Sequence, residues 1–153
     1  MHLYLVQHAE AKSEEEDPER SLSDKGRNDI RKVASFLSGL KNLSTIFHSG
    51  KTRARQTAEV LSAYLRPANG ISEAGGLKPM NDLSVWINRL EGIEEDTMLV
   101  GHLPHLSKLA SALLCQDENR KVIAFQMGGV VCLSRDASGN YSIAWMITPQ
   151  MLE

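Results

Sequence analysis

Two patterns of apolar and polar residues recur along most of this 153-residue chain. Short apolar runs are typical of buried strands, and apolar positions three or four residues apart are typical of helices with one buried face. The runs predict strands at residues 2–6, 45–48, 71–74 and 97–100. A periodic segment follows each of them, which predicts helices at residues 23–40, 51–65, 82–90 and 104–114. Ser23 and Asp82 are suited to cap helix starts, Pro104 suits a first turn, and Pro67 ends the second helix.

The pattern changes after residue 114. Three further strands are predicted at residues 122–125, 130–134 and 141–147, and Ala137-Ser138-Gly139-Asn140 between the last two is typical of a hairpin turn. The early strands should be parallel because a crossover helix follows each one, whereas the hairpin adds an antiparallel edge. We therefore predict one α/β domain over residues 1–153, a single mixed, mostly parallel sheet with helices on both faces.

Composition and charge exclude several classes of protein. The chain is 42% hydrophobic and 24% charged, which is typical of a globular domain rather than a disordered or fibrous one. Its net charge of −2 and pI near 6.2 give no basic surface for nucleic acid. No apolar run reaches the roughly 18–20 residues of a membrane span, so we expect neither a nucleic-acid nor a membrane partner.

The cysteines and the N-terminus indicate the compartment. Cys115 and Cys132 stand in apolar segments and predict free thiols in a reducing environment. The first residues lack the basic start and long apolar core of a signal peptide. We therefore expect a cytoplasmic protein.

One segment has a biased composition. Residues 12–20 contain Glu14-Glu15-Glu16-Asp17, and Pro18 interrupts any helix there. These residues are too polar for a core, so the simplest interpretation is a solvated loop. The alternative is a flap over a substrate, because the segment directly follows the first strand and its chemical motif.

Polar side chains follow three of the predicted parallel strands. Ligands of open α/β sheets bind outside the carboxyl ends of the strands, so residues at those ends are candidates for a site. The candidates are Gln7, His8 and Glu10 after the first strand, His48, Ser49, Lys51 and Arg53 after the second, and His102 and His105 after the fourth.

These residue types suit phosphoryl transfer. A neutral imidazole can attack phosphorus and form a covalent phosphohistidine, and a second histidine can donate hydrogen bonds or move a proton. An arginine fork matches two phosphoryl oxygens, and helix N-termini add backbone N–H groups for an anion. Because no cluster of residues has metal-ligand spacing, we expect no metal and no cofactor.

The motifs resemble those of the histidine phosphatase superfamily, whose fold is shared with cofactor-dependent phosphoglycerate mutases, and in particular the small SixA-type phosphohistidine phosphatases. The family's Arg-His-Gly reads Gln7-His8-Ala9, and its Leu-Ser/Thr-x-x-Gly reads Leu22-Ser23-Asp24-Lys25-Gly26. Ser-Pro-x-x-Arg-Ala-x-Gln-Thr reads Ser49-Gly50-Lys51-Thr52-Arg53-Ala54-Arg55-Gln56-Thr57. The second histidine motif reads Val100-Gly101-His102-Leu103-Pro104, Leu77-Lys78-Pro79 precedes the third helix, and the chain ends on a SixA-like Trp145-Met146-Ile147-Thr148-Pro149.

The resemblance implies a three-layer, phosphoglycerate mutase-like fold and a set of roles. By position, His8 is the nucleophile, Arg53 clamps the phosphoryl group and His102 binds and stabilises it. Gln7, Ser49, His48 and Glu10 are expected to contact substrate, although Glu10 is equally well explained as a solvated carboxylate. The chain lacks the large insertions of the mutases. We therefore expect a monomer that acts on a phosphorylated protein of the histidine phosphotransfer type, or on a small phosphoester.

One departure from the family pattern leaves two functions open. Gln7 stands where the family has arginine, so a fixed charge and a bidentate fork are missing. Removing one preorganised donor typically costs ~10²–10³ in rate. His48 and Lys51 are the candidates to supply the missing charge. The chain is either a metal-independent phosphatase that acts through His8, or a weakened or inactive module that binds phosphate or a phosphoprotein on the same fold. Arg55 should face away from the site, about 200° around the helix from Arg53.

Overall fold

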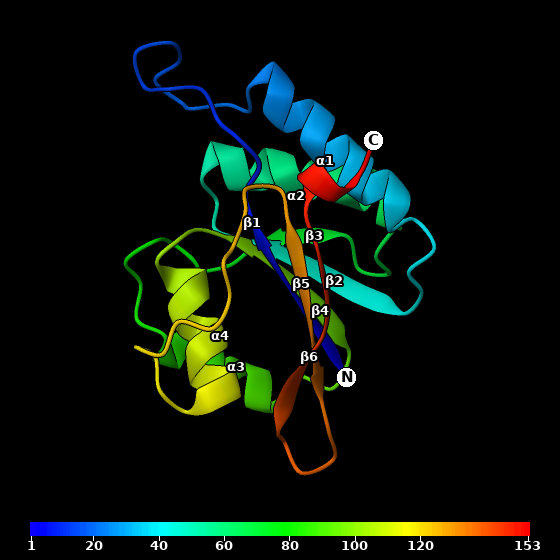
Figure 1. Ribbon diagram of the computed structural model, residues 1–153, viewed down its shortest axis with the longest axis vertical. Helices are drawn as coiled ribbons and strands as arrows, with labels where there is room; N and C mark the ends of the chain where they lie inside the picture. Colours follow the sequence, from blue (N-terminus) through cyan, green and yellow to red (C-terminus); the bar gives the residue numbers. More distant parts are fainter.

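Six strands form one sheet in the computed structural model, which describes all residues from 1 to 153 (Figure 1). The strands are β1 (His2–Gln7), β2 (Leu43–His48), β3 (Ile71–Glu73), β4 (Asp96–Gly101), β5 (Val130–Arg135) and β6 (Tyr141–Ile147). Their order across the sheet is β3-β2-β4-β1-β5-β6. The first four strands in this order are parallel, β5 is antiparallel to β1, and β6 is antiparallel to β5.

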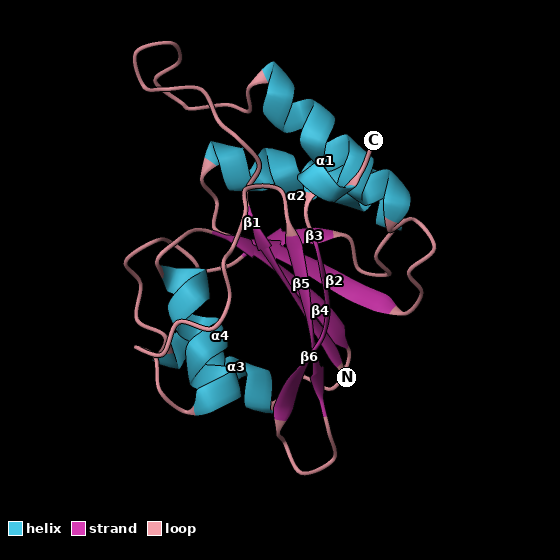
Figure 2. Ribbon diagram, viewed as in Figure 1, coloured by secondary structure: helices cyan, strands magenta, loops and turns pink.

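Helices cover both faces of this sheet (Figure 2). The helices α1 (Asp24–Phe36) and α2 (Thr52–Leu65) lie on one face, and α3 (Ser84–Glu91) and α4 (His105–Cys115) lie on the other. A short 3-10 helix, η1 (Pro149–Met151), brings the C-terminus beside α1. The mixed α/β architecture predicted from the sequence is therefore confirmed. None of the helices is long and apolar enough for a membrane span.

The core has two halves, one on each side of the sheet. Alternate residues of β1 point into different halves: Tyr4 and Val6 pack with α1 and α2, whereas Leu3 and Leu5 pack with α3 and α4. A central strand buried on both faces needs apolar residues at successive positions, which is why residues 3–6 form an uninterrupted apolar run. Burial on both faces fixes β1 and the residues that immediately follow it.

The start of α1 is held against the loop that follows β1. The Ser23 hydroxyl accepts a hydrogen bond from the Gly26 backbone N–H at 3.0 Å, which caps the helix as predicted. A Cβ at position 26 would overlap the Glu10 carbonyl oxygen. The Leu-Ser-x-x-Gly segment therefore combines a cap with a close approach between two backbones.

Most predicted elements are present within a few residues of their expected bounds, but the strand at residues 122–125 is wrong. This segment is an irregular loop between α4 and β5. Ile123 is buried and Phe125 packs against the α3–α4 half of the core, while Val122 is 45% exposed. The short apolar run that suggested a strand instead belongs to a loop in which Ile123 and Phe125 pack against the core.

The packing of Gly26 predicts a matched pair of glycine substitutions. Gly26→Ala should destabilise the fold by about 1–3 kcal/mol, the usual cost of overpacking, because the new methyl group meets backbone that cannot swing away. Gly39→Ala is the control, since a Cβ there would meet nothing within 4 Å. Urea unfolding monitored by circular dichroism measures both. Equal midpoints for the two variants would contradict this account.

Candidate active site

Two buried histidines face each other where β1 and β4 end. The two strands are paired so that Gln7 lies opposite Gly101, and the His8 backbone N–H donates to the Gly101 carbonyl at 3.0 Å. This register places His8 and His102 at the same edge of the sheet. Their ring centroids are 5.1 Å apart with planes tilted by 50°. The two predicted catalytic histidines are therefore neighbours.

His8 is held in the form that a nucleophile needs. Its Nδ1 lies 2.7 Å from the Ala9 carbonyl oxygen. Because a carbonyl can only accept, Nδ1 carries the proton and Nε2 keeps its lone pair. Burial lowers the pKa of His8 to about 4, and the nearby charges of Arg53 and Arg20 act in the same direction. The ring is therefore neutral at neutral pH.

His102 is in short contact with Ser49, the first residue of the arginine-containing motif at residues 49–57. Its Nε2 lies 2.6 Å from Ser49 Oγ, which also accepts a hydrogen bond from the Lys51 backbone N–H at 3.3 Å. Its Nδ1 is buried without a partner. Burial lowers the pKa of His102 to about 3, with His8, Arg53, Lys51 and His105 contributing. Two neutral imidazoles thus stand among cationic groups.

Arg53 is brought to the histidines by α2. It is the second residue of the helix, and its Nε is buried without a partner. Arg53, Lys51 and Arg20 form none of the ion pairs in the structure. Burial and the charge of Arg20 lower the pKa of Arg53, and Glu14 opposes them. An edge with unpaired cations and neutral imidazoles can receive an anion.

Thr57 and Gln56, in the motif at residues 49–57, form hydrogen bonds that connect the segments of the site. These roles were not predicted from the sequence. The Thr57 hydroxyl donates to the Arg53 carbonyl at 2.7 Å and accepts from the Ala9 N–H at 3.0 Å. The Gln56 side-chain oxygen accepts from the Leu22 N–H at 2.8 Å. These bonds tie α2 to the segments on either side of the loop at residues 12–20. The signal for them is their spacing, three and four residues after Arg53, which places them on the same side of the helix.

Gln7 and Glu10 lie beside the histidines without contacting them through hydrogen bonds. Gln7 Oε1 is buried with no partner. The Glu10 carboxylate accepts a hydrogen bond from Ser23 Oγ at 2.9 Å, which joins it to the start of α1. Their contacts to substrate stay predictions.

His48 has different surroundings from the other two candidate histidines. Its Nδ1 accepts a hydrogen bond from the Gly50 N–H at 3.1 Å. Burial lowers its pKa, and the charges that act on it belong to Glu73, Arg55 and Glu59 rather than to the cations near His8. Arg55 pairs with Glu59 at 2.6 Å and does not join Arg53, as its place on the helix predicts.

Gly50, which replaces the family's proline, has a positive φ and lies close to Glu73. Its φ of +89° is a backbone conformation that favours glycine and that a proline ring cannot adopt. A Cβ there would also overlap the Glu73 carboxylate. The departure from the family pattern at position 50 therefore has a local structural reason.

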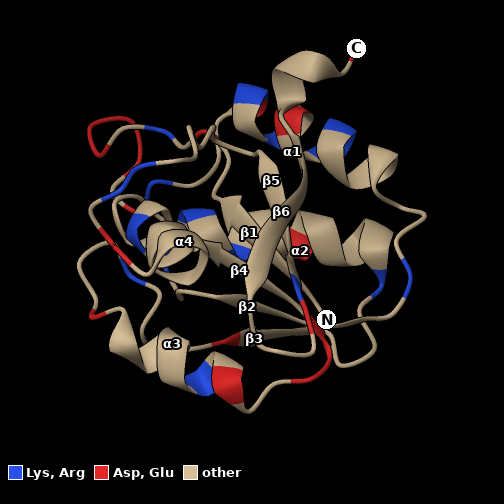
Figure 3. Cartoon of the chain, turned by 60° about the horizontal axis from the view of Figure 1, so that its bottom comes forward, with Lys and Arg blue, Asp and Glu red and all other residues tan.

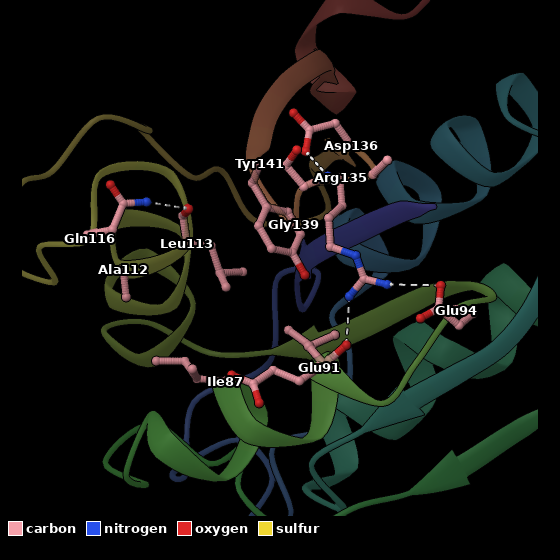
Figure 4. Close-up of a pocket in the computed structure, with 13 residues that line it drawn as sticks. Ile87, Glu91, Glu94, Ala112, Leu113, Gln116, Arg135, Asp136, Gly139 and Tyr141 are labelled. Atoms are coloured by element: carbon pink, nitrogen blue, oxygen red, sulfur yellow. Dashed lines mark hydrogen bonds and ion pairs between the residues drawn. The ribbon is translucent and has the colours of Figure 1, made fainter.

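One hollow of the molecule lies away from the histidines. A hollow of about 610 Å³ opens between α3, α4 and the β5–β6 hairpin (Figure 4). Arg135 donates there to the Leu90 and Ile93 carbonyls. The hairpin is at the amino ends of the parallel strands, so this hollow is remote from His8. No group of three or more His, Cys, Asp or Glu side chains is placed to hold a metal ion.

The buried neutral histidines predict a loss of stability in mild acid. In the unfolded chain these imidazoles take up protons below their ordinary pKa of 6.5, whereas in the folded protein the pKa is about 4 for His8 and about 3 for His102. The contribution of these two neutral imidazoles to the free energy of unfolding is present above pH 6.5 and is lost as the pH falls. For His8 the shift corresponds to on the order of 3 kcal/mol. Urea midpoints should fall steeply from about pH 6.5 down to between pH 4 and pH 3. An equally steep fall in a His8→Gln, His102→Gln double variant would contradict an origin in these two side chains.

Comparison with solved structures identifies the fold. The fold is similar to the protein histidine phosphatase SixA in complex with tungstate, with 22% identity, a TM-score of 0.85 and 100% of both chains covered. A structure described as the putative phosphohistidine phosphatase SixA of Agrobacterium tumefaciens matches at 20% identity and a TM-score of 0.79, over 97% of each chain. A phosphoserine phosphatase variant from Entamoeba histolytica matches at 13% identity and a TM-score of 0.74, over 99% of each chain. At such identities these likenesses establish the fold alone.

Sequence comparison gives the family. No curated protein matches the chain significantly. Residues 3–79 match the model of the histidine phosphatase superfamily, branch 1, a range that contains His8 and Arg53. The chain therefore belongs to the histidine phosphatase superfamily.

Proposed function

We propose that this chain is a phosphohistidine phosphatase that works through a covalent phosphohistidine on His8. The observation that carries the proposal is the pairing of a neutral His8, whose Nε2 is free, with His102 at a ring separation of 5.1 Å. A nucleophile and an anion-stabilising group are then available at the same edge of the sheet. Membership of the histidine phosphatase superfamily supports phosphatase activity.

The proposed reaction has two steps. His8 Nε2 attacks the phosphorus atom, the bond from phosphorus to the substrate nitrogen breaks, and that nitrogen takes up a proton from the solvent, which hydrolysis later returns. Water then attacks the phosphorus of phospho-His8, which releases phosphate and restores the free imidazole. Arg53 holds oxygens of the transferred group, and His102, whose ring is held by Ser49, stabilises the group from the other strand end.

The side chains of the protein supply the charge for this reaction. Loose phosphoryl transfer mainly requires positioning and stabilisation of negative charge. Arg53, Arg20 and Lys51 all carry unpaired positive charge close enough to act on the histidines. We therefore propose that hydrolysis needs no metal ion.

A protein substrate is favoured by the surface around His8. Three loops at the carboxyl edge of the sheet each expose a large apolar side chain: Met80, Leu103 and Met127. Leu103 directly follows His102, and Met127 precedes Gly128, whose N–H donates to the Gln7 carbonyl at 2.9 Å. Exposed apolar side chains that gather into one patch are typical of protein–protein contacts, and we propose that these three belong to such a patch. The likeness to SixA structures supports phosphohistidine as the group that this partner carries.

A binding module without efficient turnover is the second candidate. Gln7 in place of arginine favours it, because the position supplies no charge and its amide oxygen is buried without a partner. Such a module would keep His8, Arg53 and His102 for recognition of a phosphorylated partner.

Phosphate release from a histidine-phosphorylated phosphotransfer domain separates these two functions. We expect wild type to turn over and His8→Ala to lose at least about 10³-fold in rate, as removal of a nucleophile does. His2→Ala is the matched control, since His2 begins the strand that His8 directly follows, and its side chain is 47% exposed. A wild type that binds the phosphorylated domain and releases no phosphate would favour the binding module.

The apolar side chains around the site predict a split between large and small substrates. Leu103→Ser with Met127→Ser should raise KM for the phosphorylated domain severalfold and leave hydrolysis of a small aryl phosphate unchanged, because only a protein reaches these side chains. Phe36→Ser is the control, since Phe36 is 63% exposed on α1. Equal effects on both substrates, or none on either, would count against a protein substrate.

A further inference from the structure

The loop between β1 and α1 is fixed in a way that its composition did not indicate. It contains residues of both charges (Figure 3), and its sequence predicts a solvated loop or a flap. The two ends of the loop are hydrogen-bonded to each other: the Lys12 N–H donates to the Ser21 carbonyl at 2.8 Å, and Ala11 forms an antiparallel bridge with Leu22. The base of the loop is therefore held three residues from His8.

Arg20 stands at this base in a constrained conformation. Its φ of +52° is left-handed, and its N–H donates to the Asp17 carbonyl at 2.8 Å. Its side-chain Nε donates to the Lys12 carbonyl at 3.1 Å. The Asp17 carboxylate accepts from the Ser21 hydroxyl and from the Ser21 and Glu19 N–H groups, so the turn before Arg20 is fixed as well.

The hydrogen bond through Nε leaves the rest of the guanidinium free. Neither terminal nitrogen of Arg20 has a hydrogen-bond partner, and no carboxylate is within ion-pairing distance. The charge of Arg20 lowers the pKa of both His8 and Arg53, so Arg20 lies near both side chains. A fixed, unpaired fork beside a nucleophile and a second arginine has the properties of an anion ligand.

We propose that Arg20 supplies the second cationic fork for the phosphoryl oxygens, in the role left vacant by Gln7. This inference rests on the proposed function, since it gives Arg20 a part in holding the same phosphoryl group. The side-chain Nε2–H of Gln7 then donates to an oxygen as a neutral partner of Arg20, and Arg53, whose Nε is buried without a partner, holds the group from the α2 side. The hydrogen-bonded turn of the acidic loop would then serve to position Arg20.

His48 and Lys51, which the sequence suggested as sources of the charge missing at Gln7, fit this role less well. The charges around His48 are those of Glu73, Arg55 and Glu59, and no cation of the site is among them. Lys51 acts on His102 and carries a single ammonium, which cannot hold two oxygens as a planar fork does.

A rescue experiment tests the proposal. Tungstate affinity is measured by calorimetry for wild type, Arg20→Gln, Gln7→Arg and the double variant, and kcat and KM are measured in parallel. We expect Arg20→Gln to weaken tungstate binding about tenfold and to lower kcat/KM about 10²-fold, as loss of a charged donor does. Gln7→Arg should restore most of both losses in the double variant. Arg20→Lys should fall between, because it keeps the charge and loses the fork.

The controls separate a ligand role for Arg20 from a purely structural one. Arg31→Gln removes one positive charge from an exposed position on α1 and should change nothing. If Arg20 only stiffens the loop, Gln7→Arg will not rescue the variant, which overturns the proposal. Unchanged tungstate affinity in Arg20→Gln also overturns it. If wild type releases no phosphate but binds tungstate through Arg20, the proposal stands and the proposed phosphatase function fails.

Discussion

The parallel pairing of β1 with β4 is the constraint on which the site depends. It sets Gln7 opposite Gly101, and so the next residue of each strand extends beyond the sheet at the same edge. His8 and His102 are 94 positions apart in the sequence and become neighbours through this register alone. A register shift of one residue would turn the side chains to opposite faces and separate the two rings. Burial of β1 on both faces by the two halves of the core prevents such a shift.

Burial around the site also determines its chemistry. The imidazoles are kept neutral because a charged ring would be poorly solvated there and would stand beside arginines. Neutrality gives His8 the lone pair that a nucleophile requires, at a cost in stability when the pH falls. The same cations that disfavour protonation are unpaired, so an incoming phosphoryl group would satisfy them. Nucleophilicity and anion binding therefore have a common physical origin.

The sequence was sufficient for the architecture and for part of the site. Apolar patterning located all four helices and all six strands, and strand ends located the residues around His8 and His102. Residues 122–125 were wrongly predicted as a further strand because a loop that packs on the core can carry a short apolar run as a strand does. The position of Arg20 was missed for a different reason. Its approach to the site depends on a left-handed turn and on hydrogen bonds across the loop, which local composition does not encode. Thr57 was missed because its hydrogen bond to Ala9 joins segments 48 residues apart.

Trapping the phosphorylated enzyme tests the central claim most directly. The protein is mixed with a histidine-phosphorylated domain, quenched in alkali within the first turnover, and mapped by mass spectrometry. The account predicts one alkali-stable, acid-labile phosphoryl group on His8 in wild type, and none in the His8→Ala variant. Turnover with no phosphoryl group on the enzyme, or with the group on another residue, would contradict it.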